Sequence, residues 1–399
     1  MKKVIYMDNN ATTKVDEEVF EEMKPYFTSL YGNPSSMHTF GGQVGKKIEV
    51  AREKVARLIG AQYTTEIIFT SCGTESNSTA VYSALQAYPD RKEIITTRVE
   101  HPAIISLAPH LEKQGIAVIQ LKVDKYGNLD LKEYDRYLNE DTTLVTVMTA
   151  NNETGVIFPV EKMAQIAKEK GVLFHTDAVQ AAGKIPINMN NSAVDMLSIS
   201  GHKLHAPKGI GALYLRRGTR FRPFLRGGHQ ERNRRSGTEN VTSIIGLGKA
   251  VEIAQNHIDE ENTRVKEMRD RLEGEILKIV PRTILNGDKK NRLPNTTNIS
   301  FEFVEGEGIL LLLNELGIAA SSGSACTSGA LEPSHVLRAM GVPFTAAHGS
   351  IRFSLSRYNT MEEVDYVIKN LPPVIERLRS ISPYWKDGRP TLEFEPQYN

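Results

Sequence analysis

The chain has 399 residues, of which 40% are hydrophobic and 24% charged, and this length suits two domains or one large domain with an appended lobe. A net charge of +1 gives no overall field for binding nucleic acid or a membrane surface. No apolar run approaches the length of a membrane span, and the N-terminal apolar run is too short for a secretory signal, so we expect a cytoplasmic protein. The two cysteines, Cys72 and Cys326, are too few for a structural zinc site or a disulfide framework, so we expect free thiols and no intrinsic metal.

Short apolar runs alternate with amphipathic segments through the first part of the chain. The apolar runs predict strands at residues 67–70, 93–97, 117–123, 143–150, 172–176, 196–200 and 211–215. Between them, the periodicity predicts helices that include residues 75–88 and 160–170. This alternation is typical of an α/β domain with a mostly parallel sheet covered by helices.

The rest of the chain has a different pattern. A long helical pattern at 241–279, which ends before Pro281, predicts a helix linking this domain to a second one. Beyond it, strand patterns at 297–303 and 350–354 mix with helical patterns at 308–316 and 361–381. This mixture predicts a smaller α+β lobe.

A lysine and an aspartate follow two of the predicted strands. Lys203 comes after the strand at 196–200, and Asp177 follows the strand at 172–176. A lysine amine can form a Schiff base with an aldehyde, and a carboxylate can keep a pyridine nitrogen protonated. Each residue taken alone is better explained as a surface lysine or a helix-capping aspartate, but the pair predicts a site for pyridoxal 5'-phosphate (PLP).

Small residues between a strand and a helix indicate a phosphate site. The backbone N–H groups of Gly73 and Thr74 follow the strand at 67–70 and start a helix, so they point toward a bound anion. Such residues are more often only a helix cap. Ser200 and His202 add donors that can reach the same phosphate.

Two further side chains are candidates for contact with the cofactor. His101 follows the strand at 93–97 and can stack on the cofactor ring or shuttle protons, although a histidine at a helix N-terminus is an equally good explanation. Gln180 lies three residues after Asp177 and can donate a hydrogen bond to the phenolic oxygen of the cofactor.

The motifs of several other enzyme classes are missing from the sequence. It contains no G-x-S-x-G, H-E-x-x-H, G-x-x-x-x-G-K-[ST] or G-x-G-x-x-G. His202 and His205 lie three residues apart but lack a nearby cysteine or third ligand, so a metal pair is not expected.

The segment at residues 320–330 carries the second cysteine. Ten of its eleven residues are Ala, Ser, Gly or Thr, which predicts an accessible loop. Cys326 in such a loop, beside an electrophilic centre, suits nucleophilic transfer chemistry. Cys72 lies at the end of a predicted core strand, and we expect it to be buried and inert.

Taken together, these motifs resemble the cysteine desulfurases of the NifS/IscS type, in the class V aminotransferase family of PLP enzymes. The most specific are Asp177-Ala178-Val179-Gln180 and Ser200-Gly201-His202-Lys203. The full set of matching segments is 8–13, 32–36, 74–77, 100–101, 151–155, 177–180, 200–203, 235–240 and 321–326. They are spread over nearly the full length, so the resemblance covers the whole chain.

The resemblance implies PLP fold type I, as in aspartate aminotransferase, with a mostly parallel seven-stranded sheet in a large domain and a smaller α+β domain. It places the large PLP-binding domain at residues 16–258. The small domain then comprises residues 1–15 and 259–399 and carries the catalytic cysteine loop at about 321–331.

The resemblance also implies an activity. A cysteine desulfurase converts L-cysteine to L-alanine and forms a persulfide, here on Cys326, which is passed to acceptors for iron–sulfur cluster assembly. Lys203, Cys326 and His101 match the catalytic positions. An IscU/NifU-like scaffold is the implied acceptor, so any metal contact of the persulfide is with that partner's iron–sulfur cluster.

Further roles follow from the same pattern. Arg352 and Asn152 match the residues that hold the substrate carboxylate, and the planar guanidinium suits that contact. Thr238 matches a residue that crosses a two-fold interface to the cofactor phosphate, which implies a homodimer.

Two other functions remain open. A different PLP enzyme of the same fold, such as a selenocysteine lyase or an aminotransferase, would leave Cys326 without a role. A sulfur carrier or scaffold protein would use only the cysteine loop and bind no cofactor.

Overall fold

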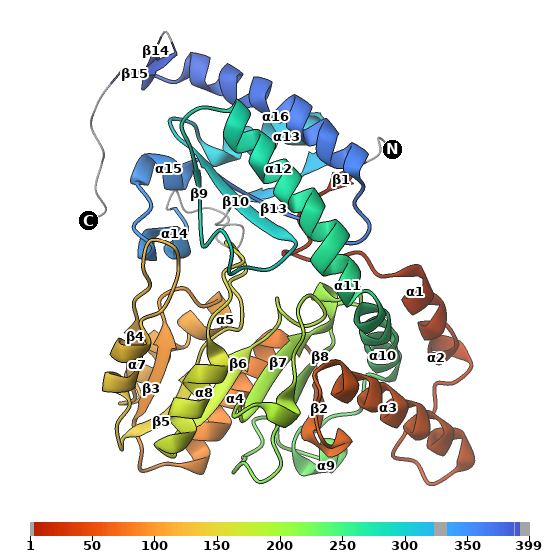
Figure 1. Ribbon diagram of the computed structural model, residues 1–399. Coiled ribbons are helices and arrows are strands. Elements are labelled where there is room, and N and C mark those ends of the chain that lie inside the picture. The colour runs from red at the N-terminus through yellow and green to blue at the C-terminus, as the bar shows by residue number, and fades with distance from the viewer. Residues whose placement is uncertain (1–3, 323–332, 387, 392–399) are drawn as a thin grey trace.

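The computed structural model describes residues 4–322, 333–386 and 388–391. Figure 1 shows two lobes, with a large sheet in the lower lobe and a smaller sheet in the upper lobe. Among the described residues, the strands form a seven-stranded sheet, a four-stranded sheet and two two-stranded sheets. In this part of the chain, no helix is long and apolar enough to cross a lipid bilayer.

The seven-stranded sheet has the order β2-β8-β7-β6-β5-β3-β4. Its strands are β2 (Ile67–Thr70), β3 (Glu93–Thr97), β4 (Ala117–Leu121), β5 (Thr142–Thr146), β6 (Leu173–Asp177), β7 (Met196–Ser200) and β8 (Gly211–Leu215). Only β8 runs antiparallel to its neighbours, β2 and β7. The carboxyl ends of the other strands therefore meet at one edge of the sheet, where α/β proteins usually bind their ligands.

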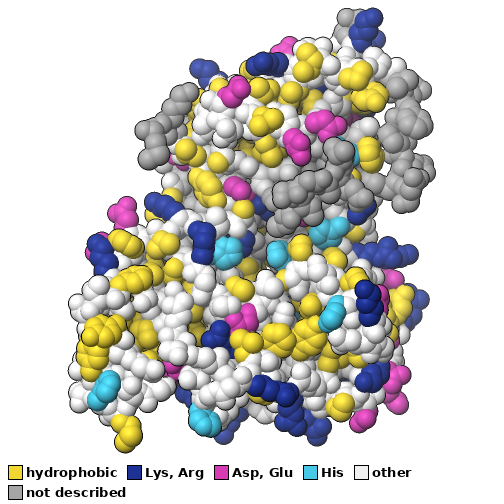
Figure 2. Space-filling model, turned by 180° about the vertical axis from the view of Figure 1, so that it is seen from behind, with side chains coloured by type: hydrophobic (Ala, Val, Ile, Leu, Met, Phe, Trp, Pro, Cys, Tyr) yellow, Lys and Arg dark blue, Asp and Glu magenta, His cyan; other side chains and the backbone are white. Residues whose placement is uncertain are grey.

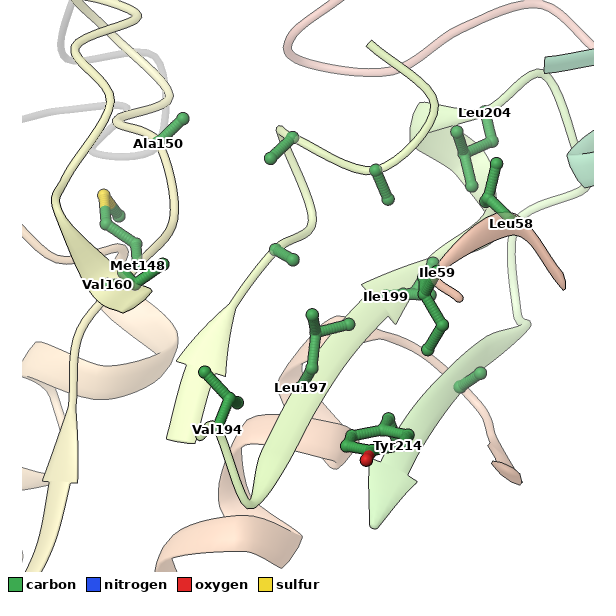
Figure 3. Packing of buried hydrophobic residues seen from close by; sticks show 14 of the residues in the cluster. Leu58, Ile59, Met148, Ala150, Val160, Val194, Leu197, Ile199, Leu204 and Tyr214 are labelled. Atoms are coloured by element: carbon green, nitrogen blue, oxygen red, sulfur yellow. The ribbon is translucent and has the colours of Figure 1, made fainter. Parts of the chain in front are cut away.

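Several strands of this sheet are buried along their whole length, whereas the edge strand β4 is partly exposed. Every residue of β5, β7 and β8 is buried, as expected for a sheet covered on both faces. Leu197 on β7 lies opposite Tyr214 on β8. Figure 3 shows these two side chains and Ile199 packed in one layer, with Leu58 and Ile59 beside Ile199.

Helices cover both faces of this sheet. In the large lobe they are α1 (Glu17–Met23), α2 (Pro25–Thr28), α3 (Thr39–Leu58), α4 (Gly73–Ala87), α5 (Pro102–Ile105), α6 (Ala108–Glu112), α7 (Leu131–Tyr137), α8 (Val160–Glu169), α9 (Gln230–Asn233) and α10 (Val241–Asn256). The 3-10 turns are η1 (Thr64–Glu66), η2 (Met189–Asn191) and η3 (Gly201–Lys203). α3 and α10 approach closely at Gly248, where an added Cβ would lie 2.6 Å from the Cβ of Ala51.

The strands predicted at 67–70, 93–97, 196–200 and 211–215 have the predicted limits. The strand predicted at 117–123 ends at Leu121, and the one predicted at 172–176 is shifted by one residue to Leu173–Asp177. The strand predicted at 143–150 differs most, because it forms only at Thr142–Thr146. β5 ends at Thr146. The residues after it still follow β6, because the Val147 N–H donates to the carbonyl O of His175 at 3.2 Å and the Thr149 N–H to that of Asp177 at 2.8 Å. At Ala150 the chain turns back and forms a bridge with Ile157. Residues 147–150, the predicted end of this strand, therefore belong to a buried loop at the edge of the sheet.

The prediction of one continuous helix at 241–279 is wrong, because the regular α-helix is interrupted in the middle of this segment. The chain forms α10, then α11 (Ile258–Glu260), a π-helical turn η4 (Glu261–Val265) and α12 (Lys266–Ile279). The side-chain amide of Asn262 donates to the carbonyl oxygens of Ile258 and Lys184, at 2.8 and 2.7 Å. A side chain that competes for helix carbonyls in this way interrupts the regular ladder.

The upper lobe is built on the antiparallel sheet β12-β13-β10-β9. Its strands are β9 (Thr283–Leu285), β10 (Thr296–Phe301), β12 (Ser321–Ser322) and β13 (Ser350–Ser354), and β1 (Ile5–Tyr6) pairs with β11 (Ile318–Ala319) beside it. The helices are α12, α13 (Gly306–Glu315), α14 (His335–Ala339), α15 (Phe344–His348) and α16 (Met361–Ile381), followed by the hairpin β14 (Trp385–Lys386) and β15 (Arg389–Pro390). A separate buried cluster, which includes Leu272, Phe301 and Phe353, forms its core.

One segment of the predicted small domain packs on the large sheet's core. Val336 and Leu337 of α14 and Ala346 of α15 belong to the same buried cluster as the residues of β7 and β8. This contact brings the start of α14 to the carboxyl edge of the large sheet. The domain limits at residues 16–258 and 259–399 stay a prediction.

Candidate functional site

A cavity of about 460 Å³ lies at the carboxyl edge of the seven-stranded sheet, where the two lobes meet. Figure 2 shows histidine side chains gathered at the junction of the lobes. Of the predicted site residues that the structure describes, all but Thr238 line this cavity: Gly73, Thr74, His101, Asn152, Asp177, Gln180, Ser200, His202, Lys203 and Arg352. The structure therefore brings together groups that are up to 279 residues apart in the chain, from Gly73 to Arg352.

Lys203 lies in the 3-10 turn η3, directly after β7. Its Nζ donates to the carbonyl oxygen of Ala11 at 2.8 Å and also to that of Asn10. The amine is thus held over the N-terminal segment at the cavity wall.

Asp177 ends β6 and is buried. Its carboxylate accepts two hydrogen bonds, from Asn77 Nδ2 at 2.6 Å and from the Val179 N–H at 2.9 Å. Charge-assisted bonds of this kind fix a carboxylate in one orientation. Asp177 is therefore a carboxylate held in one orientation at the cavity wall.

The start of α4 forms another part of the wall. The helix begins at Gly73, and the side chain of the N-cap residue Cys72 does not cap it. The first N–H groups of the helix are therefore available to an anion. Nearby, the Oγ of Ser200 is buried and has no hydrogen-bond partner among the described residues. Gly73 is required here, because an added Cβ would lie 2.9 Å from Val179 Cγ2.

The prediction that Cys72 is buried is wrong. The residue is half-buried and lines the cavity. It follows the end of β2, at the point where the chain leaves the core and turns into α4. A position at the carboxyl edge of the sheet, rather than within the strand, explains its exposure.

Three histidines at the cavity are held in their neutral forms. Burial lowers the pKa of His101, and the positive charge of Lys203 acts in the same direction. Burial and Lys203 also lower the pKa of His202 to about 4. His335, whose Nε2 lies 2.9 Å from the carbonyl oxygen of Glu100, has its pKa lowered by burial too. Neutral rings can accept as well as donate hydrogen bonds at this site.

Two buried glutamates flank the same region. Burial raises the pKa of Glu100 to about 8, and its carboxyl group accepts hydrogen bonds from the Met148 N–H at 3.0 and 3.1 Å. Burial also raises the pKa of Glu153 to about 7, although the Ser334 hydroxyl donates to it and Arg352 lies near. Both carboxyl groups are thus protonated at a higher pH than an exposed glutamate.

Arg352 comes from β13 of the upper lobe and is 3% exposed. Its guanidinium donates to the carbonyl oxygen of Asn152 at 2.9 Å and to Oδ1 of Asp8 at 2.8 Å. Its Nε is buried and lacks a hydrogen-bond partner among the described residues. The site therefore holds a buried cation with an unused donor beside the cavity.

One predicted site residue that the structure describes lies elsewhere. Thr238 is exposed and lines a separate small pocket beside Ser71 and Arg235. Arg235 forms an ion pair with Glu75 of α4, with Nε 2.8 Å from Oε1, so the Thr238 segment is attached to the outer side of that helix. Cys326 lies outside the described residues.

Sequence reasoning assigned no role to several residues that shape the cavity. They are Asn10, Asn77, Met148, Glu153, Ser334 and His335. Asn77 could have been predicted from the sequence, because it lies four residues after Gly73 and so on the same face of the predicted helix. Ser334 could not have been predicted in this way, since only the packing of α14 on the large lobe brings it to the site.

The residues present fit a bound PLP. An amine, a fixed carboxylate and an uncapped helix N-terminus surround one cavity, and these are the groups that react with its aldehyde, pair with its pyridine nitrogen and bind its phosphate. The Ser200 Oγ, which is buried and has no hydrogen-bond partner in the described part of the chain, supplies a further donor on the side of α4.

The chain matches one protein family and several known proteins over most of its length. The profile of the family "Aminotransferase class-V" matches residues 5–367. The cysteine desulfurase NifS of Azotobacter vinelandii is 60% identical over 398 residues, which cover 99% of this chain and 99% of that protein. A cysteine desulfurase of Enterobacter agglomerans is 57% identical over 400 residues, covering 99% of this chain and 100% of that protein.

Solved structures agree with these matches. A NifS-like protein superposes with a TM-score of 0.88 at 40% identity, covering 94% of this chain and 100% of that chain. SspA in complex with cysteine superposes with a TM-score of 0.79 at 32% identity, covering 89% of this chain and 100% of that chain.

Proposed function

Since this chain belongs to the class V aminotransferase family and is a PLP-dependent cysteine desulfurase, we propose that it converts L-cysteine to L-alanine and transfers the sulfur to Cys326. The predicted family and the predicted PLP fold type I are both confirmed. The observation that supports the proposal most is the convergence of Lys203, Asp177 and the N-terminus of α4 on one cavity.

We assign the cofactor contacts residue by residue. Asp177 pairs with the pyridine nitrogen, and its two N–H partners keep it oriented. His101 stacks on the ring, and Gln180 donates to the phenolic oxygen. The phosphate is bound by Gly73, Thr74, Ser200 and His202 at the start of α4, with Thr238 from a second subunit.

The substrate carboxylate is held by Arg352 and Asn152. Arg352 supports this role because its guanidinium is buried beside the cavity and its Nε has no partner among the described residues. A planar guanidinium binds a carboxylate through paired hydrogen bonds. Asn152 lines the same cavity and already contacts Arg352 through its carbonyl oxygen at 2.9 Å.

The reaction needs one proton carrier and one nucleophile from the chain. PLP, when bound, supplies an electron sink that makes the α-carbon of the amino acid acidic. Lys203 Nζ removes and returns the proton at that carbon, and neutral His101 accepts or donates a proton beside it. The Cys326 thiolate attacks the sulfur of the substrate, so the bond from carbon to sulfur breaks and a bond between two sulfur atoms forms. L-cysteine and the Cys326 thiol thus become L-alanine and a Cys326 persulfide.

The biological setting follows from the same assignment. We propose a homodimer acting in the cytoplasm, with the large domain at residues 16–258 and the small domain at 1–15 and 259–399. An IscU/NifU-like scaffold protein receives the sulfur for iron–sulfur cluster assembly. The 60% identity to the NifS of Azotobacter vinelandii supports this assignment.

One assay tests the reaction. The purified protein is incubated anaerobically with L-cysteine, alanine is quantified, and the persulfide is located by peptide mass spectrometry. We expect alanine without any added keto acid and a persulfide on Cys326. Alanine that appears only with a keto acid would indicate an aminotransferase, and a strong preference for selenocysteine would indicate a lyase. Borohydride reduction should place a pyridoxyl label on Lys203, and a label on another lysine would contradict the assignment.

A further inference from the structure

We propose that Lys184 is a positioning residue for this reaction, because its buried ammonium group fixes the orientation of the Gln180 amide beside the cavity. The inference rests on the proposed function, since it concerns how Gln180 faces a bound PLP. Lys184 lies behind the cavity and lines a much smaller one of about 20 Å³, together with Lys203 and Glu261.

A chain of hydrogen bonds joins Lys184 to Lys203. Lys184 Nζ donates to Gln180 Oε1 at 3.3 Å, and Gln180 Nε2 donates to the carbonyl oxygen of Asn10 at 3.0 Å. The same carbonyl oxygen accepts a hydrogen bond from Lys203 Nζ. One amide and one carbonyl group therefore separate the two amines.

The two partners of the Gln180 side-chain amide, Lys184 Nζ and the Asn10 carbonyl oxygen, allow only one orientation of that amide. An ammonium group only donates hydrogen bonds, and the Asn10 carbonyl only accepts them. The Gln180 oxygen must therefore face Lys184, and its nitrogen must face Asn10. A flipped amide would lose both hydrogen bonds and place its N–H groups against the ammonium. Since Gln180 also lines the large cavity, the group it offers to a ligand is a donor.

Neighbouring residues hold Lys184 in a buried position. The side chain is 7% exposed, and burial lowers its pKa to about 8, while the negative charge of Glu261 raises it. Its carbonyl oxygen accepts a hydrogen bond from Asn262 of η4 at 2.7 Å. The preceding Gly183 has a φ of +73°, and an added Cβ would lie 2.5 Å from Leu204 Cδ2. The ammonium group is therefore buried, with Glu261 as a nearby negative charge and Gln180 Oε1 as its hydrogen-bond acceptor at 3.3 Å.

The test is a double-mutant cycle on PLP binding. The apoproteins of the parent, Lys184→Met, Gln180→Met and the double variant are titrated with PLP, and both the dissociation constant and the absorbance spectrum of the complex are recorded. Each single change should weaken PLP binding by about 5-fold, the value of one hydrogen bond, and should shift the absorbance maximum in the same direction. The double variant should match Gln180→Met alone, because Lys184 acts through Gln180.

Two further variants separate orientation from charge and from folding. Lys184→Gln keeps a polar side chain that can donate or accept, so it permits both orientations of Gln180 and should still shift the spectrum. Lys162→Met removes an exposed lysine of α8 that does not line the cavity, and should leave affinity and spectrum unchanged.

Several outcomes would overturn the inference. One is a Lys184→Gln variant with the same spectrum as the parent. Another is a double variant in which the effects of the two single changes multiply. A third is a loss of affinity in Lys162→Met equal to that in Lys184→Met. A parent protein that fails to bind PLP would instead overturn the proposed function.

Discussion

Asn77 Nδ2 lies 2.6 Å from Oδ2 of Asp177, so helix α4 and the end of β6 are joined by one hydrogen bond at the cavity. The same helix presents its uncapped N-terminus to the cavity, four residues earlier. A single helix therefore fixes two parts of the site relative to each other: the proposed phosphate site and the carboxylate proposed to face the pyridine nitrogen.

Asn77 gives the first prediction. Asn77→Ala should weaken PLP binding by about 5-fold, because Asp177 loses one of its two donors. Asn77→Asp should weaken it more, since the new carboxylate cannot donate to Asp177 and repels its negative charge. The measurement is PLP titration of the apoprotein, with Ser78→Ala as the control on the next residue of the helix. Unchanged affinity in Asn77→Asp would show that the charge of Asp177 does not matter for binding.

The buried carboxyl group of Glu100 predicts a dependence of stability on pH. Burial raises its pKa to about 8, from the ordinary value of 4.5. Between these values the folded chain holds a proton that the unfolded chain releases, so the free energy of unfolding falls as the pH rises through this window. Glu100→Gln, which resembles the protonated form, should therefore lose less stability than the parent between pH 5.5 and pH 8.5.

Thermal unfolding at several pH values checks this expectation for Glu100. The exposed Glu112→Gln is the matched control and should follow the parent curve. Parallel curves for Glu100→Gln and the parent would mean that Glu100 is ionised in the folded chain at all these pH values.

Thr238 is exposed and outside the cavity of its own chain, which predicts that it serves another subunit. Heterodimers of a Thr238→Ala chain and a Lys203→Ala chain should regain activity, because one of their two sites then has both residues intact. The measurement is alanine formation by heterodimers purified with two different tags. Inactive heterodimers would mean that each site is built from one chain.

The two cysteines should differ in their effect on turnover. Cys326→Ala should still bind PLP and change its absorbance on addition of L-cysteine, since proton transfer by Lys203 needs no thiol, but should release almost no alanine. Cys72→Ala should keep most of its turnover with weaker retention of PLP, because Cys72 lines the cavity beside the start of α4. Near-parent turnover in Cys326→Ala would contradict the proposed mechanism.

Local sequence was enough to predict the sheet and its polar edge. Strands β2, β3, β7 and β8 have the limits that their apolar runs predicted, because each is a short run buried on both faces. The break between α10 and α12 could not be predicted in this way. It includes Asn262, whose side chain donates to the carbonyl oxygen of Lys184, 78 residues away in the chain, and periodicity does not report such distant contacts.

The sequence by itself determined which groups follow the strands, and so it predicted Lys203, Asp177 and the start of α4 as parts of one site. The family resemblance added Arg352 and Asn152 to that site, but only the tertiary structure decided what they contact and which further groups, such as Glu153 and Ser334, reach it. Arg352 contacts Asn152 and Asp8 because β13 and the N-terminal segment meet at the lobe junction, and Glu153 contacts Ser334 because α14 packs on the large lobe. Strand and helix periodicity reports which face of an element is buried, but the docking of two lobes depends on the complementarity of surfaces that are distant in the chain.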